Sequence, residues 1–228
     1  MRIHRFLIDF PLTAADGVLN DHEIVHQMTK VLRLQKGEQV ELFNKTGEEA
    51  KVLISEITPN KVFFVVLEKE KNETEAKKVI LAAAIVKRDN FEWIVQKATE
   101  IGVTEIIPLH TQHSIKFGVQ IHRLQKISEE AAEQCGRRSV PVIREPEEFM
   151  DVLANSKEKN KYFFDMGGKS FGTSKKSDSI ILFVGPEGGW SEGEREEAKK
   201  AGCETMSLGK TVLRSETAAT VASYLAVN

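Results

Sequence analysis

The chain has little of what builds disulfide-rich or membrane proteins. Among its 228 residues there are two cysteines, Cys135 and Cys203, with no CxxC pair and no paired histidines at metal-ligand spacing. We therefore expect neither a disulfide framework nor a bound metal. The apolar runs are too short to cross a bilayer, and charged residues alternate with apolar ones at the N-terminus. No membrane span and no secretory signal peptide are expected, which favours a cytoplasmic protein.

An excess of charge of one sign is also missing. The formal net charge is −2, whereas domains that bind nucleic acid usually carry a basic excess. The balance is uneven, because six lysines and arginines stand against three glutamates between His110 and Arg144, together with three histidines. That segment is typical either of a local basic surface or of a solvated helix face.

The commonest nucleotide-binding motifs are absent as well. Gly209-Lys210-Thr211 resembles the end of a phosphate-binding P-loop, but the first glycine of that motif would have to stand at Glu204. No GxGxxG follows a strand-like run, so a dinucleotide fold of the Rossmann type is not expected. A nucleophile elbow for Ser/His/Asp catalysis is not expected either.

What is present is a composition typical of a globular protein, 41% hydrophobic and 29% charged. Residues 1–72 are expected to form a small β-barrel around one helix. The helix follows the spacing of Ile24, Met28, Val31 and Leu32 and is expected to end at Gly37. A charge-rich, apolar-poor stretch over Glu68–Lys78 places the domain boundary between residues 72 and 73. The expected strands are Ile3–Ile8, Val40–Phe43, Ala50–Ile57 and Lys61–Glu68.

Residues 73–228 alternate between strand and helix patterns, which predicts a parallel α/β sheet. Helices are expected over Phe91–Ile101, closed by Gly102, and over Leu124–Gln134. Ser191 with Glu194 fits a capping box that opens a third helix, and a last helix starts near Ser215. The expected strands are Val79–Val86, Ile106–Leu109, Tyr162–Phe164 and Ile180–Val184.

Two segments near the C-terminus have the composition of ligand-binding loops. Each follows a strand-like run and leads into a helix: Gly185-Pro186-Glu187-Gly188-Gly189-Trp190-Ser191, and the segment from Leu208 to Ala218. Glycines let backbone amides approach a ligand, because no Cβ stands in the way. The alternative is that these glycines only make tight turns between strand and helix.

These two segments resemble the RsmE family, SPOUT-class methyltransferases that modify N3 of a uridine in 16S ribosomal RNA. Further anchors of the resemblance are His26 with Val31-Leu32-Arg33, Lys97 to Val103, and Glu133-Gln134-Cys135-Gly136-Arg137. The resemblance covers nearly the whole chain. It implies a knotted α/β SPOUT domain over residues 73–228, preceded by a PUA-like RNA-binding barrel over residues 1–72, in a homodimer. Part of the dimer interface is expected on the final apolar helix, which carries Ala218, Ala219, Val221, Ala222 and Leu225.

By the same resemblance the two segments would bind S-adenosylmethionine. Arg214 is expected to stabilise charge on the uracil oxygens, and Glu216 to act as base or orienter for the N3 proton. Helix capping is the alternative role of Glu216. The residues expected to bind the cofactor are Gly185, Pro186, Glu187, Gly188, Gly189, Leu208, Gly209, Val212, Leu213, Thr217 and Ala218.

Contacts to 16S rRNA in the small ribosomal subunit are expected from basic and polar residues in both parts of the chain. His26 and Arg33 lie seven apart and are expected to share a helical face. The full set is Arg2, Arg5, His26, Arg33, Gln134, Arg137 and Arg138. Solvated surface charges are the alternative reading of this set.

Two positions depart from the family pattern. Thr211 stands where an arginine is usual, and His113 stands where the family usually has an arginine. Neither departure removes Arg214 or the glycines of the two segments, so activity is still expected. Two other functions stay open: a SPOUT enzyme that methylates the ribose 2′-hydroxyl, and an assembly factor that binds the ribosome without catalysis.

Overall fold

The computed structural model describes residues 3–45, 47–70, 77–115, 118–172 and 179–228. The chain forms two compact units, one of Met1–Thr74 with Ala132–Ser139, the other of Glu75–Ala131 with Val140–Asn228. The expected boundary between residues 72 and 73 lies outside the described residues. That residues 132–139 belong to the first unit was not predicted.

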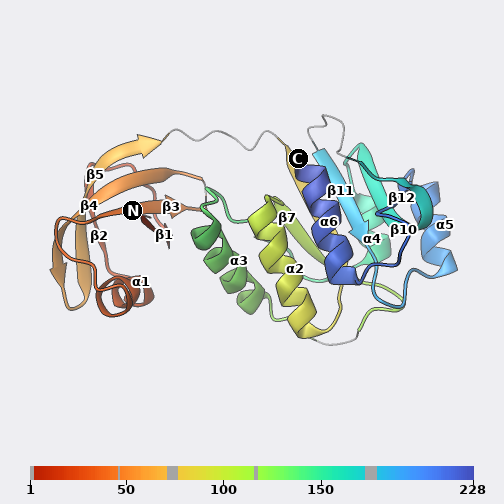
Figure 1. Ribbon diagram of the computed structural model, residues 1–228, viewed down its shortest axis with the longest axis horizontal. Helices are drawn as coiled ribbons and strands as arrows, with labels where there is room; N and C mark the ends of the chain where they lie inside the picture. The colour runs from red at the N-terminus through yellow and green to blue at the C-terminus, as the bar shows by residue number, and fades with distance from the viewer. Residues whose placement is uncertain (1–2, 46, 71–76, 116–117, 173–178) are drawn as a thin grey trace. The chain divides into compact units, whose positions relative to one another are not determined.

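The first unit is a five-stranded sheet in the order β1-β3-β4-β5-β2, drawn in red to orange in Figure 1. Strands β1 and β3 pair in parallel and the other neighbours are antiparallel. Alternate residues of the strands point inward, as the two-residue period of a strand dictates, and bury Phe6, Val40, Leu42, Val52 and Ile54 with Val25 and Met28. The strands are β1 (His4–Ile8), β2 (Asp16–Leu19), β3 (Gln39–Asn44), β4 (Glu49–Thr58) and β5 (Lys61–Glu70).

The four strands expected in this unit are confirmed, and β2 was missed. Strand β2 has only four residues, and its Gly17 lies opposite Phe64 of β5. A Cβ on Gly17 would stand 2.5 Å from the Phe64 ring. A short edge strand that contains a glycine has too weak a pattern to be recognised from sequence.

The helix of the first unit begins as expected but does not end at Gly37. Helix α1 (His22–His26) is capped by the Asp21 side chain and continues as a π-helical turn, η1 (Gln27–Val31). Arg33 then adopts a positive φ of 55°, and Gly37 lies in the turn before β3. His26 and Arg33 therefore do not share a regular helical face, which corrects the prediction from their spacing.

The second unit contains a seven-stranded sheet in the order β12-β10-β11-β6-β7-β8, with β9 paired to β7. All of these pairs are parallel. The strands are β6 (Lys78–Ala84), β7 (Glu105–His110), β8 (Val142–Ile143), β9 (Glu147–Glu148), β10 (Asn160–Ser170), β11 (Ser179–Val184) and β12 (Glu204–Ser207). The helices are α2 (Arg88–Ile101), α3 (Ile121–Cys135, whose last four residues belong to the first unit), α4 (Phe149–Asn155), α5 (Glu192–Lys200) and α6 (Ser215–Val227).

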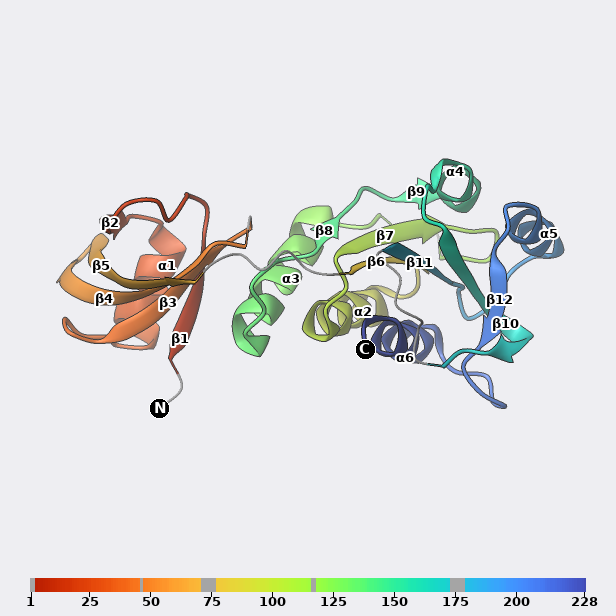
Figure 2. The same cartoon turned by 90° about the horizontal axis from the view of Figure 1, so that it is seen from above.

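Helices cover both faces of this sheet, as Figure 2 shows for α2 and α6 on one face and α4 and α5 on the other. Two separate apolar cores result. Val79 and Leu81 of β6 pack with α2 and α6, while Ile80 and Ala82 pack with α4 and α5. Burial on both faces explains why β6 and β11 are continuous apolar runs.

Most expected helix boundaries in this unit are confirmed. Gly102 closes α2 in a left-handed conformation, Ser191 and Glu194 form the capping box of α5, and α6 begins at Ser215. The short elements β8, β9 and α4 were not predicted. Helix α6 differs from expectation in one respect: Ala219 and Ala222, expected at a dimer interface, are buried in the core of their own unit.

Candidate functional site

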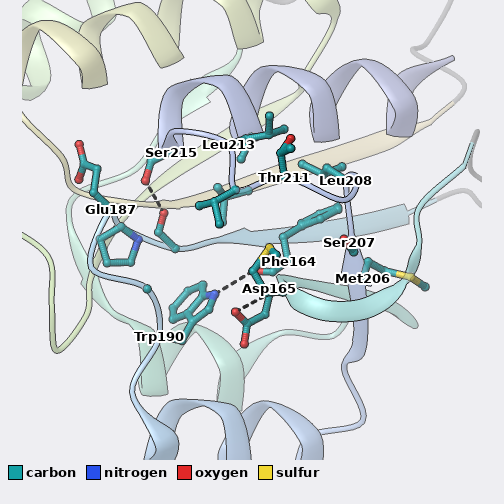
Figure 3. Close-up of a pocket in the computed structure, with 17 residues that line it drawn as sticks. Phe164, Asp165, Glu187, Trp190, Met206, Ser207, Leu208, Thr211, Leu213 and Ser215 are labelled. Carbon is teal, nitrogen blue, oxygen red and sulfur yellow. Dashed lines mark hydrogen bonds between the residues drawn. The ribbon is translucent and has the colours of Figure 1, made fainter.

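A pocket opens at the carboxyl ends of β11 and β12 and beside the middle of β10, near the edge at which α/β sheets commonly bind ligands. It measures about 680 Å³ with its open mouth included. Figure 3 shows the loops after β11 and β12 on either side of it, with the first turn of α6 closing one end. Its lining consists of Phe164, Asp165, Met166, Val184, Gly185, Pro186, Glu187, Gly189, Trp190, Met206, Ser207, Leu208, Thr211, Val212, Leu213, Ser215 and Ala218.

The structure brings together the two segments singled out in the sequence. Eight of the eleven residues expected to bind the cofactor line the pocket: Gly185, Pro186, Glu187, Gly189, Leu208, Val212, Leu213 and Ala218. Gly188, Gly209 and Thr217 lie outside the lining. The pocket therefore draws on one face of each segment rather than on every residue in it.

The two expected catalytic residues flank the pocket without lining it. Arg214 is the extended N-cap residue of α6, so Leu213 and Ser215 turn to the pocket while Arg214 is exposed. Within the described residues its guanidinium has no hydrogen bond or ion pair. The carboxylate of Glu216 is half-buried, and its Oε2 atom is buried without a hydrogen-bond partner in the described part of the chain.

Three hydrogen bonds at the pocket help to hold the loop after β11. The indole Nε1–H of Trp190 donates to the carbonyl of Phe164 at 3.0 Å, and the hydroxyl of Ser215 donates to the carbonyl of Gly185 at 2.8 Å (Figure 3). The Gly189 N–H donates to the Pro186 carbonyl at 2.9 Å. A Cβ on Gly185 would stand 2.8 Å from Trp190 Nε1. At this position, then, glycine is needed to admit the protein's own indole.

Strand β10 supplies one wall of the pocket, which the sequence patterns did not predict. Phe164 and Asp165 stand at the end of its apolar run, so the rule that ligands bind at the carboxyl ends of parallel strands was the available signal. Asp165 accepts hydrogen bonds from the Met166 N–H at 2.9 Å and from Arg195 Nε at 2.6 Å. The hydrogen bond that Arg195 donates to Asp165 is the main cause of the raised pKa of Arg195.

A GxSxG pattern does occur, over Gly168–Gly172, but the structure gives it a different role. Its Ser170 lies in β10 and pairs with Ser207 of β12. A nucleophile elbow requires a sharp turn from strand to helix. Ser170 is therefore a strand residue, and no elbow forms there.

Several residues expected to contact RNA are gathered in the first unit. The Arg5 guanidinium, 13% exposed, pairs with Glu41 at 2.9 Å and with Glu49, and its Nη2 donates to the Arg137 carbonyl at 3.1 Å. Arg138 pairs with the same Glu49 carboxylate at 3.0 Å. Arg5 is thus bound inside an ion cluster rather than presented to solvent.

The remaining RNA-contact candidates are exposed or not described. His26 stacks on His22 with ring centroids 6.4 Å apart, and His26, Arg33 and Gln134 are exposed. Arg2 lies outside the described residues.

Comparison with known proteins gives a consistent result. A family model described as RNA methyltransferase domain matches residues 72–227, and one described as RNA methyltransferase PUA domain matches residues 19–67. The ribosomal RNA small subunit methyltransferase E of Bacillus subtilis is 31% identical over 214 residues, 86% of this chain and 84% of that protein. Its namesake from Rickettsia conorii is 34% identical over 234 residues, 97% of this chain and 94% of that protein.

The chain belongs to the RsmE family, the ribosomal RNA small subunit methyltransferases E. A crystal structure of the family's member from Neisseria gonorrhoeae, bound to S-adenosyl methionine, matches with a TM-score of 0.89 at 28% identity. The match covers 97% of this chain and 95% of that one. The resemblance drawn from the motifs is confirmed, and with it the PUA-like domain followed by an α/β methyltransferase domain of the SPOUT class.

Two further features of this RsmE member concern membrane-spanning helices and metal ligands. No helix in the described part of the chain is long and apolar enough to span a membrane. Among the same residues, no three His, Cys, Asp or Glu side chains are grouped so that they would hold a metal ion.

Proposed function

We propose that this protein transfers a methyl group from S-adenosylmethionine to N3 of a uridine in the 16S ribosomal RNA of the small ribosomal subunit. The observation that carries the proposal is the pocket itself, because the two glycine-bearing segments meet there although a strand and a helix separate them in sequence. Family membership supplies the reaction class. The choice of N3 rests on the motif resemblance.

The pocket residues suit S-adenosylmethionine. Val184, Pro186, Leu208 and Leu213 provide apolar surface for a purine and its ribose. Glu187 places a carboxylate beside a ligand whose sulfonium and ammonium outnumber its single carboxylate, whereas the Asp165 carboxylate is already paired with Arg195. The solved family member with S-adenosyl methionine bound supports the same assignment.

When bound, S-adenosylmethionine supplies an electrophilic methyl carbon. The chain's own residues then have to position the uracil and manage the N3 proton. Arg214 is exposed beside Leu213 and Ser215, and no internal partner holds its guanidinium within the described residues. It is therefore free to donate to a uracil oxygen as negative charge develops on the ring.

Glu216 is the proposed base or orienter for the N3 proton. Its buried Oε2 atom lacks a hydrogen-bond partner among the described residues, and a buried carboxylate oxygen is costly to leave unpaired. A substrate N–H would satisfy it. Glu216→Gln keeps the size of the side chain but cannot accept a proton. We expect methylation to fall about 100-fold with unchanged affinity for S-adenosylmethionine; full activity would remove Glu216 from this role.

The other parts of the proposal concern partners. The PUA-like unit would hold the ribosomal RNA, and two copies of the chain would form a homodimer in the cytoplasm with the knotted topology of SPOUT proteins. Trp93 on α2 is 40% exposed and Tyr224 on the adjacent α6 is 58% exposed. These aromatic side chains, rather than the buried alanines of α6, are the candidates for a shared interface. Light scattering would test the homodimer.

The decisive experiment uses isotopically labelled S-adenosylmethionine with small ribosomal subunits that lack the modification. After reaction the RNA is digested and its nucleosides are analysed by mass spectrometry. Labelled 3-methyluridine is the expected product. A label on a ribose would instead identify a 2′-O-methyltransferase, and no label despite subunit binding would identify an assembly factor.

A further inference from the structure

The residues that follow β7 form a compact turn that contacts the glycine-rich loop, residues 185–191 after β11. We call Thr111–Ser114 the β7 turn. It is closed by its own hydrogen bonds, from the Thr111 N–H to Ser114 Oγ at 3.0 Å and from the Ser114 N–H to the Thr111 carbonyl at 3.2 Å. The turn does not line the pocket. Any influence it has on a ligand must therefore pass through the loop that it contacts.

A buried carboxylate joins the β7 turn to the end of the glycine-rich loop. Glu194, only 4% exposed, accepts the Ser191 N–H at 2.7 Å and the Ser191 hydroxyl at 2.9 Å within its capping box. Its other oxygen accepts the Gln112 N–H at 2.9 Å, across 82 positions of sequence. Because a buried carboxylate is costly without such donors, Glu194 holds the β7 turn against the end of the glycine-rich loop at Ser191.

His113 makes the second connection, directly to the glycines. Its Nδ1 lies 3.0 Å from the Gly189 carbonyl, so Nδ1 carries the hydrogen that is donated. A Cβ on Gly188 would stand 3.0 Å from the His113 Cβ, well inside the roughly 3.5–4.0 Å at which carbons pack best. Gly188 does not have a positive φ, unlike Gly189 at 71°. Its backbone alone would therefore accept alanine.

We infer that Gly188 is a glycine in order to admit His113 rather than a ligand, and that the β7 turn is thereby a positioning element of the pocket. Gly188 itself does not line the pocket, whereas Glu187 and Gly189 on either side of it do. A shift at residue 188 moves both neighbours. His113 and Glu194 act through these loop residues and touch no ligand. The inference rests on the proposed function only in its choice of S-adenosylmethionine as the ligand.

The test is a double-mutant cycle with a matched pair of backgrounds. Gly188→Ala is made in the wild type, in His113→Gly and in His113→Ala. Both His113 variants lose the ring and its hydrogen bond, but only His113→Gly removes the Cβ that Gly188→Ala would meet. In the wild type and in His113→Ala, we expect Gly188→Ala to weaken S-adenosylmethionine binding by about tenfold, the order expected for overpacking. In His113→Gly its effect should shrink to less than about twofold.

Equal losses of affinity in all three backgrounds would show that the ligand itself contacts residue 188, and the inference would be wrong. Hydrogen–deuterium exchange of residues 185–191 without ligand gives an independent reading. Gly188→Ala should speed this exchange in the wild type and in His113→Ala but not in His113→Gly; the same rate in each background would also overturn the inference. If the wild type binds no S-adenosylmethionine, the proposed function fails, and the exchange data still decide the role of His113.

Discussion

The loops after β11 and β12 line the same pocket but are held in different ways. The first is fixed to the rest of its unit through Trp190, Ser215 and His113. The second has local bonds between Ser207 and Gly209. Within the described residues, nothing further holds Gly209–Leu213 by hydrogen bonds, and Val212 is 77% exposed. One wall of the pocket is tied to the rest of its unit by side-chain hydrogen bonds, and the other has only local ones.

This contrast indicates that the two loops contribute differently to stability and to function. Few buried contacts and exposed side chains place the second loop at the low-stability end of the structure. The first loop is anchored in the packed core through the buried Pro186 and Trp190. Changes in the first loop should therefore cost stability, and changes in the second should cost function alone.

The largest effect is expected at Arg214, in the second loop. Arg214→Ala should lower kcat by about 100-fold or more, the loss typical when a donor to developing charge is removed. Affinity for S-adenosylmethionine and the melting temperature should stay unchanged, because Arg214 neither lines the pocket nor pairs within the described residues. Labelled methyl transfer measures kcat, calorimetric titration measures the affinity, and thermal unfolding measures the melting temperature. A drop in melting temperature would break the contrast between the loops.

Gly185→Ala, in the first loop, should mainly reduce stability. The new Cβ would stand 2.8 Å from Trp190 Nε1, and the indole is 3% exposed with no room to retreat. Overpacking of this kind costs about 1–3 kcal/mol, measured by chemical denaturation. The control Gly193→Ala has no neighbour within 4 Å of its Cβ and should be neutral, or stabilising by up to about 1 kcal/mol as a helix position. Equal losses for both variants would contradict the packing argument.

The smallest effect is expected for Val212→Ala at the open rim. Because Val212 is 77% exposed, its truncation should change unfolding free energy by less than about 0.5 kcal/mol. Ligand contact with its side chain would be lost, so affinity for S-adenosylmethionine should fall about threefold. Val142→Ala, 61% exposed in β8 and outside the pocket, is the control and should leave affinity unchanged. If Val212→Ala destabilises the fold instead, the second loop is more tightly packed than this contrast allows.

The sequence predicted the long elements better than the short ones. Burial on both faces made β6 and β11 readable as apolar runs, and local chemistry placed Gly102, the capping box at Ser191 and the start of α6. The π-helical turn over Gln27–Val31 broke the inference from the spacing of His26 and Arg33. A prediction from residue spacing assumes a regular α-helix, and the spacing does not reveal that a π-helical turn contains one extra residue.

The sequence by itself was enough to single out the two loop segments that line the pocket, because strand, glycine-rich turn and helix start are local patterns. Only the tertiary structure decided which residues of those segments face the pocket, and that Asp165 of β10 joins them. It also decided that Arg5 is bound by Glu41 and Glu49, and that His113 lies on Gly189 across 76 positions of sequence. The physical reason is that strand order and side-chain contact depend on long-range packing, which the period of a single element does not encode.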